Sequence, residues 1–218
     1  MPQRLYLLRH GQTDANISRI IAGQSPDMPL NDTGLKQATF TAKALSKTVF
    51  HRIYMSPSLR ARQTAKEIFE CHTPTIFGEV EEKFREINFG VLEGFSYNKA
   101  EESHGDVLEI YRENPSRCVF PKGESMAEAY DRIARGINKV LIEHPINESV
   151  LIVSHGGTIA LIFLYLFNLD MDTIFHAIRH NNCGLSIINL QNNQWNAPQH
   201  KPQIICMNDI SHLKEEHY

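Results

Sequence analysis

The order of apolar and polar positions along the chain predicts strands that alternate with helices. Apolar runs expected to be strands lie at Arg4–Leu8, at about Arg52–Met55 and in the stretch SVLIVS, residues 149–154. The last run is apolar almost throughout, which is typical of a strand buried on both faces of an α/β sheet. Near the C-terminus, the runs GLSIINL and QIICMND, joined by a polar segment, predict an edge hairpin. This order predicts a three-layer α/β domain with a mostly parallel, mixed sheet.

Two helices are predicted in the first third of the chain. In the first, apolar residues recur at helical spacing at Leu35, Ala38, Ala42 and Leu45. Either Asn31 or Asp32, both short polar residues, is expected to cap its N-terminus. Ser58 is expected to cap a second helix.

Two further helices are predicted later in the chain. Ser125, followed three residues later by Glu128, has the form of a capping box and predicts the start of a long amphipathic helix, with Pro145 marking its end. The longest apolar run, Ile159–Phe167, follows Thr158 and is too short to span a bilayer, so it is expected to be a buried helix.

Composition and charge narrow the class of protein. At 218 residues and 42% hydrophobic content, with no linker or repeat, the chain is expected to form one domain over residues 1–218. With 22 basic and 25 acidic residues it has no overall basic surface that would recruit nucleic acid. The N-terminus does not resemble a signal peptide, and no membrane partner is expected. The four cysteines show no paired or metal-ligand spacing, which favours reduced thiols and a cytoplasmic location.

Polar side chains that suit an anion follow three of the predicted strands. Arg9-His10-Gly11 follows the first, Ser56–Arg60 follows the second, and Ser154-His155-Gly156-Gly157 follows the third. Because ligands of open α/β sheets bind outside the carboxyl ends of the strands, these segments are expected to meet at one edge. Two arginines and two histidines beside helix N-termini indicate a phosphate site.

The same segments resemble the motifs of a known family. In order and spacing, LRHGQTDAN, SPSLRARQTA, REINFGVLEG and SHGGTI resemble the histidine phosphatase superfamily, in its phosphoglycerate-mutase-like branch. The match extends from about residue 4 to residue 160. It implies a three-layer α/β/α sandwich, in agreement with the layout predicted above, and a phosphoric monoester hydrolase of the histidine acid type.

The resemblance also implies how the phosphoryl group is bound and attacked. His10 is the expected nucleophile, whose neutral imidazole forms a phosphohistidine. Arg9 and Arg60 are expected to neutralise charge on the equatorial oxygens, so that no metal or cofactor is needed. Asn16 is expected to donate from its side-chain amide, with a purely local turn as the alternative.

Three further residues complete the implied site. His155 is expected to bond to the phosphoryl group and, if protonated, to add positive charge, while the N–H of Gly156 adds a donor. Glu86 is expected to protonate the leaving alkoxide and later to activate water. A solvated acidic face is the alternative for this region, since four more glutamates lie close by, at Glu79, Glu81, Glu82 and Glu93.

Other polar residues are expected outside the catalytic site. Arg62 lies on a different helix face from Arg60 and is expected at the surface. The remaining histidines show no metal spacing and are expected at the surface or in loops, namely His51, His72, His104, His144, His176, His180 and His200.

The choice of reaction depends on the segment Val91–Pro121, which is short. Its three basic residues, Lys99, Arg112 and Arg117, are interspersed among acidic ones, which argues against a second phosphate site and favours hydrolysis. The segment FPKGES is also similar to that of fructose-2,6-bisphosphatase-type and α-ribazole-phosphate-phosphatase-type members. The expected substrate is a small phosphomonoester of the sugar phosphate, α-ribazole phosphate or phosphoserine type. A cofactor-dependent phosphoglycerate mutase and a catalytically silent phosphate-binding domain are the alternatives.

The walls beyond the phosphate and the oligomeric state stay open at this point. Lys122 either contacts a second anionic group or is solvated. The candidate wall residues are Ser25, Pro26, Met28, Phe95, Tyr97 and Tyr111.

Overall fold

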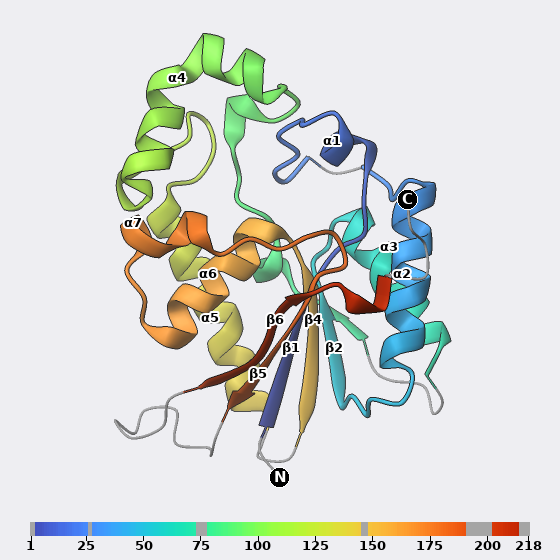
Figure 1. The fold of residues 1–218 in the computed structure, drawn as a ribbon. Coiled ribbons are helices and arrows are strands. Elements are labelled where there is room, and N and C mark those ends of the chain that lie inside the picture. Colours follow the sequence, from blue (N-terminus) through green and yellow to red (C-terminus); the bar gives the residue numbers. More distant parts are fainter. Residues whose placement is uncertain (1–2, 26–27, 73–77, 145–147, 191–201, 214–218) are drawn as a thin grey trace.

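A mixed sheet between two layers of helices forms the centre of the fold (Figure 1). The computed structural model describes residues 3–25, 28–72, 78–144, 148–190 and 202–213. The six strands have the order β3-β2-β4-β1-β5-β6. They are β1 (Gln3–Arg9), β2 (Arg52–Met55), β3 (Gly78–Val80), β4 (Ser149–Ser154), β5 (Leu185–Leu190) and β6 (Gln203–Asp209). β1, β2, β3 and β4 run parallel to one another, and β5 pairs antiparallel with both β1 and β6, so the predicted mostly parallel, mixed sheet and its C-terminal hairpin are confirmed.

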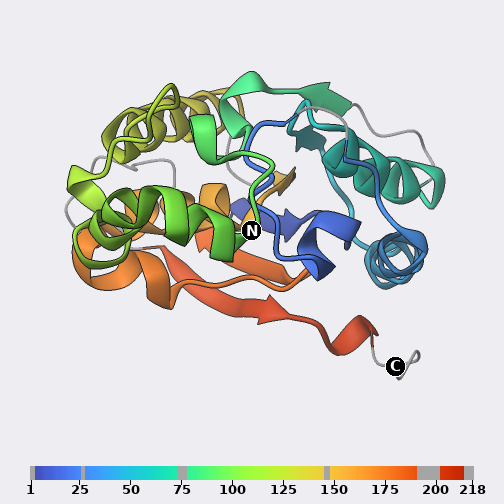
Figure 2. The same cartoon turned by 90° about the horizontal axis from the view of Figure 1, so that it is seen from above.

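Helices cover both faces of the sheet. They are α1 (Asp14–Ile17), α2 (Asp32–Leu45), α3 (Leu59–Glu70), α4 (Tyr97–Glu113), α5 (Met126–Glu143), α6 (Gly156–Phe167) and α7 (Met171–Ile174). α2 and α3 lie on one side of the strands and α5 and α6 on the other, as the view from above also shows (Figure 2). The predicted three-layer α/β/α sandwich is therefore confirmed.

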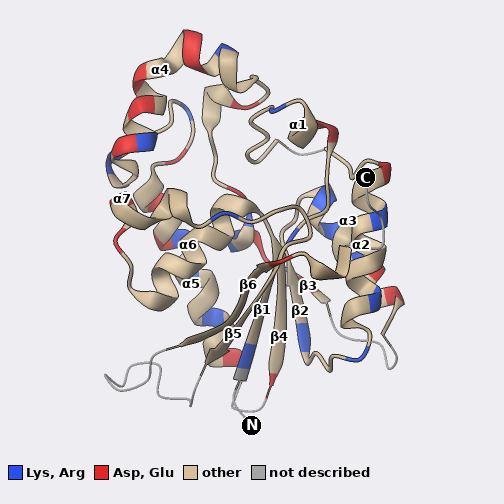
Figure 3. Ribbon diagram, in the orientation of Figure 1, with Lys and Arg blue, Asp and Glu red and all other residues tan. Residues whose placement is uncertain are grey.

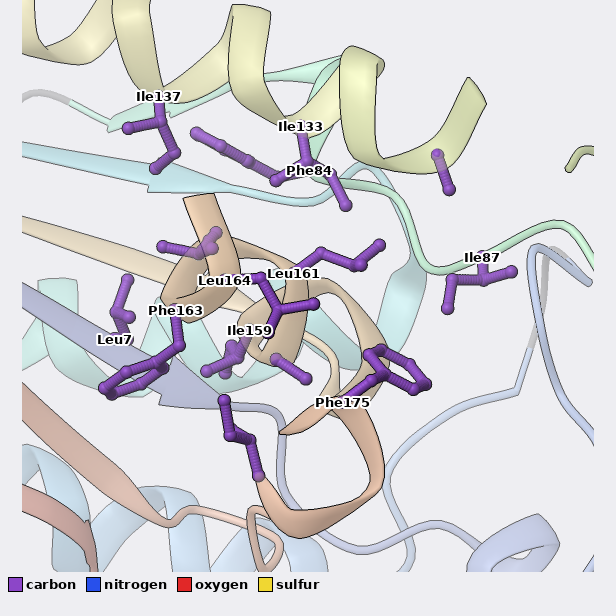
Figure 4. Close-up of a cluster of buried hydrophobic side chains, with 14 of the residues drawn as sticks. Leu7, Phe84, Ile87, Ile133, Ile137, Ile159, Leu161, Phe163, Leu164 and Phe175 are labelled. Atoms are coloured by element: carbon purple, nitrogen blue, oxygen red, sulfur yellow. The ribbon is translucent and has the colours of Figure 1, made fainter. Parts of the chain in front are cut away.

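The alternation of side chains along β1 explains why helices are packed on both faces. Leu5 and Leu7 point into the larger apolar cluster, with residues of α5 and α6 (Figure 4), whereas Tyr6 and Leu8 pack with α2 and α3. Helix α6 is apolar on almost every side and is buried, as expected for the run Ile159–Phe167.

Two of the predicted helix starts are confirmed with their caps. Of the two candidates for α2, Asn31 is the cap, and its side chain accepts a 2.9 Å hydrogen bond from the N–H of Gly34. Ser125 and Glu128 form the predicted capping box at the start of α5. That helix ends at Glu143, and Pro145 lies outside the described residues.

Other local predictions are wrong, each for a physical reason. Ser58 precedes α3 but makes no capping bond, since its hydroxyl contacts His155 and Ser56 instead. Helix α6 begins at Gly156 and not after Thr158.

Helix α4 was not predicted because its sequence lacks a regular apolar face. Only Ala100 and Leu108 are buried, and His104 has non-helical backbone angles at a kink. Acidic residues recur along its outer surface (Figure 3). It nevertheless contributes Tyr97 and Tyr111 to a pocket at the carboxyl ends of the strands.

Among the described residues, no helix is long and apolar enough to cross a membrane. All four cysteines are unpaired.

Candidate active site

The carboxyl ends of β1, β2 and β4 meet at one edge of the sheet, as the sequence predicts. Arg9 pairs with Ser154 in the β1–β4 register, and Met55 pairs with Val153 in the β2–β4 register, so the loops after these strands are neighbours. They border a pocket of about 630 Å³. All the predicted site residues line it, namely Arg9, His10, Asn16, Arg60, Glu86, His155 and Gly156.

His10 is held in the orientation that a nucleophile needs. Its Nδ1 lies 2.7 Å from the carbonyl oxygen of Gly11, and because a carbonyl only accepts, Nδ1 carries the hydrogen. The lone pair is then on Nε2. Gly11 has no room for a side chain, since a Cβ there would lie 2.5 Å from the carbonyl oxygen of Gly34. The N–H of Gly11 donates to the Thr64 hydroxyl at 3.0 Å, which fixes the loop to α3.

Burial and neighbouring cations keep both site histidines neutral. His10 is 4% exposed and His155 is 1% exposed, with ring centroids 5.2 Å apart. Burial lowers the pKa of each well below its ordinary value, and the positive charges of Arg60 and Arg9 lower both pKa values further. His155 is therefore neutral near neutral pH, and it does not add the positive charge that it would carry if it were protonated. Its Nε2 lies 2.8 Å from the Ser56 hydroxyl, and its buried Nδ1 has no hydrogen-bond partner in the described part of the chain.

Two guanidinium groups, those of Arg9 and Arg60, supply the positive charge that acts on His10 and His155. Arg60 is 1% exposed, and its Nη2 donates to the carbonyl of Gly23 at 2.8 Å. Arg9 donates through Nη1 to the carbonyl of His180 at 2.5 Å. In both, the buried Nε has no hydrogen-bond partner among the described residues. Burial lowers the pKa of both groups, but a guanidinium stays charged. These donors suit an anion bound between the two arginines.

Glu86 is the only carboxylate among the described residues that line this pocket. It lies against the start of α6 and accepts hydrogen bonds from the N–H groups of Thr158 at 3.0 Å and Gly157 at 3.1 Å. A third bond comes from its own neighbour, Ile87, at 3.0 Å. Its charge acts on both Arg9 and Arg60, whose pKa values it raises against the larger effect of burial.

The other glutamates of this region are used elsewhere. Lys139 pairs with Glu79 and Glu81, and Arg85 pairs with Glu82. Glu93 accepts from the N–H groups of Gln24 and Phe89.

Asn16 and Gly156 both line the pocket, and Asn16 also makes the local turn that was considered as its alternative role. Its Oδ1 accepts from the N–H of Thr13 at 3.1 Å, which closes a capping box around α1. Its side-chain NH₂ has no partner in the described residues and lies at the pocket. The N–H of Gly156 is also unpaired there, whereas the next two amides of α6 bond to Glu86.

Several expectations for the surrounding residues are wrong. His72, His144 and His180 are buried, and each ring has at least one hydrogen-bond partner inside the fold. His176 and His180 line the pocket, whereas His200 lies outside the described residues. Among the described residues, no group of three potential metal-binding side chains is found.

The wall candidates are only partly correct. Tyr97 and Tyr111 line the pocket, but Ser25, Met28 and Phe95 do not, and Pro26 lies outside the described residues. Lys122 is exposed in a left-handed turn and does not line the pocket, which favours solvation. Arg62 is exposed, as predicted.

An ion pair that the sequence does not reveal supports the loop of Glu86. Arg132 on α5 donates through Nη1 to the carbonyls of Lys83 at 2.7 Å and Arg85 at 3.1 Å. Its Nη2 pairs with Glu124 at 2.6 Å, and Glu124 also accepts from the N–H of Asn88. The arginine and the glutamate thus hold both sides of the loop. The segment FPKGES contains Glu124, but nothing in the sequence links it to Arg132.

This arrangement can be compared with known proteins. The family described as "Histidine phosphatase superfamily (branch 1)" matches residues 5–201. The chain belongs to the histidine phosphatase superfamily. This confirms the resemblance carried by the four sequence motifs, and the superfamily's fold agrees with the sandwich described above.

Individual relatives within the superfamily carry different names. The chain is 30% identical over 213 residues, 98% of both chains, to "Putative phosphoserine phosphatase 2" of Hydrogenobacter thermophilus. It is 32% identical to "Probable phosphoglycerate mutase GpmB" of Yersinia pestis over 197 residues, 89% of this chain and 88% of that one. A phosphoserine phosphatase from Entamoeba histolytica, solved with 3-phosphoglyceric acid, superposes with a TM-score of 0.81 at 25% identity. That comparison covers 97% of this chain and 99% of the other.

Proposed function

We propose that this protein is a metal-independent phosphomonoester hydrolase of the histidine acid type, which transfers the phosphoryl group through His10. The observation that carries the proposal is the neutral imidazole of His10, with its Nε2 lone pair free, between two buried guanidinium groups that have unpaired donors. The names of the relatives agree with phosphatase chemistry on small metabolites. The expected substrate is of the sugar phosphate, α-ribazole phosphate or phosphoserine type.

The first half of the reaction forms a covalent intermediate. Nε2 of His10 attacks phosphorus in line with the leaving oxygen, so a P–N bond forms while the P–O bond to the alcohol breaks. Arg9 and Arg60 bind the equatorial oxygens and offset their charge, which is the main requirement of phosphoryl transfer. Glu86 enters this step in its protonated form and gives that proton to the leaving alkoxide, which leaves the carboxylate.

The second half returns the enzyme to its starting state. Water attacks the phosphohistidine, Glu86 takes a proton from this water, and the P–N bond breaks to release phosphate. The side-chain NH₂ of Asn16 and the N–H of Gly156 bind the phosphoryl oxygens in both halves. Because the two arginines offset the charge of the phosphoryl oxygens, the reaction requires no metal ion.

The alternative activity is that of a phosphoglycerate mutase, which the name of the Yersinia pestis relative favours. In that case the phosphohistidine is resolved by a second phosphorylated ligand, and activity depends on priming by a bisphosphoglycerate.

One experiment separates these activities. Release of phosphate is measured from p-nitrophenyl phosphate, phosphoserine, α-ribazole phosphate, fructose bisphosphates and 3-phosphoglycerate, with mutase activity assayed in parallel. We expect hydrolysis that is strongest for one compound. Primed interconversion of phosphoglycerates without hydrolysis contradicts the proposal, and inactivity in both assays favours a catalytically silent domain.

A further inference from the structure

The pocket extends well beyond the phosphate-binding end. Its volume of about 630 Å³ lies in the range of pockets that enclose a whole small molecule. The far wall comes from α4, which contributes Tyr97 and Tyr111, and from residues 175–181, which contribute His176 and Arg179. The two parts are joined by a 2.6 Å hydrogen bond between Nε2 of His176 and the carbonyl of Tyr111. This wall is in place to contact the part of the substrate that is not transferred.

Two arginines line this far part of the pocket, and they differ in their partners. Arg112 makes two hydrogen bonds to the carboxylate of Glu101, at 2.7 and 2.9 Å, so its charge is already neutralised. Arg179 donates through Nε to the carbonyl of His176 at 3.2 Å. Within the described part of the chain it has no carboxylate partner, and its two terminal nitrogens are free. Arg179 therefore supplies one uncompensated positive charge.

Two tyrosines line the same pocket as Arg179. Neither the Tyr97 nor the Tyr111 hydroxyl has a hydrogen-bond partner in the part of the chain that the structure describes. Burial raises the pKa of both hydroxyls, the negative charge of Glu86 raises it further, and the positive charge of Arg179 lowers it. Glu86, both tyrosines and Arg179 line the same pocket, so a leaving group bound in it occupies a space that all four side chains border.

We propose that Arg179, with the hydroxyls of Tyr97 and Tyr111, binds a carboxylate carried by the leaving alcohol. The natural substrate is then a phosphomonoester of a small hydroxy acid. A guanidinium with two free terminal nitrogens matches the two oxygens of a carboxylate. A second phosphate carries about 1.5 to 2 negative charges, whereas the residues described at this end of the pocket offer one free cation, so a carboxylate fits better. This inference rests on the proposed phosphatase activity.

The test uses two substrates that differ only in the carboxylate. O-phosphoserine carries it, and phosphoethanolamine has the same skeleton without it. We expect the wild-type protein to hydrolyse O-phosphoserine with a kcat/KM roughly ten- to a hundredfold higher, because a hydrogen bond between charged groups is worth that much. In Arg179→Gln most of this preference disappears, mainly through a higher KM for O-phosphoserine. Arg112→Gln is the matched control, and it retains the preference because Arg112 is paired with Glu101.

Two results overturn the carboxylate subsite while leaving the proposed function intact. One is a wild-type protein that hydrolyses both substrates equally well. The other is an Arg179→Gln variant that retains the full preference. By contrast, failure of the wild-type protein to release phosphate from any monoester overturns the proposed function itself.

Discussion

Replacing Glu86 by glutamine tests the role of the general acid without emptying the site. The amide oxygen can still accept from Ile87 and Thr158, but the new NH₂ group faces the N–H of Gly157, where the carboxylate oxygen accepted a 3.1 Å bond. The lost bond and the unpaired N–H should cost about 1–3 kcal/mol of stability. A typical domain tolerates such a loss, so the variant should remain folded.

The effect on catalysis should depend on the leaving group. For a substrate that leaves as an alkoxide, loss of the acid should slow formation of the phosphohistidine about 10²–10⁴-fold, or about 2.7–5.4 kcal/mol. A p-nitrophenolate leaves without needing that proton. Rapid mixing with p-nitrophenyl phosphate should therefore show a burst of nitrophenolate close to the wild-type rate, followed by slow turnover, because Glu86 is also needed to activate water.

Comparing the burst rates of alkyl and aryl phosphates tests whether Glu86 transfers a proton. Equal loss of the burst rate for alkyl and aryl phosphates would show that Glu86 positions the phosphate and does not transfer a proton. An unchanged rate with alkyl phosphates would exclude it from catalysis. Thermal unfolding of the variant provides the control for folding.

Three further predictions concern the support of the site, its protonation and its independence of metal. Arg132→Met should lower the free energy of unfolding by about 3 kcal/mol, because it breaks a largely buried ion pair with Glu124 and leaves the carbonyls of Lys83 and Arg85 without their donor. Urea unfolding checks the loss of stability, and an unchanged kcat would show that the loop keeps its shape without this arginine. Burial holds the pKa of His10, His155 and His180 below 6.5, that of His180 at about 4, so the unfolded chain binds protons more readily. Stability should therefore fall as the pH drops from about 6.5 towards 4, and unfolding curves that do not change over that range would contradict the buried neutral state. Chelators should leave phosphate release unchanged, and a loss restored by a divalent ion would argue for a metal.

The sequence predicts the catalytic end of the pocket well because its residues are encoded locally. Each of the segments after β1, β2 and β4 follows an apolar strand directly, and the topology of a parallel sheet brings such strand ends together. Arg9, His10, Arg60 and His155 therefore follow from the strand pattern together with the family motifs. Glu86 could be identified only from the family motif, because its position depends on hydrogen bonds to α6, which is remote in the sequence.

The residues at the far end of the pocket cannot be predicted from the strand pattern and the family motifs. Helix α4 has no regular apolar face, so the sequence does not indicate that Tyr97 and Tyr111 turn towards one site. Arg179 lies in the segment before β5, within the polar run RHNNCG. Nothing else in the local sequence indicates that it lines the pocket. The burial of His72 and His144 also depends on partners remote in the sequence, which periodicity does not reveal.

The most direct test of the central claim is to trap the phosphoryl group on the protein. The wild-type protein is mixed with a phosphomonoester labelled with ³²P and quenched in alkali within milliseconds, and the labelled peptide is identified by mass spectrometry. The account predicts acid-labile label on His10 that approaches one equivalent when release is slow, and none in the folded His10→Ala variant. Hydrolysis without any labelled protein, or label that persists in His10→Ala, would contradict it.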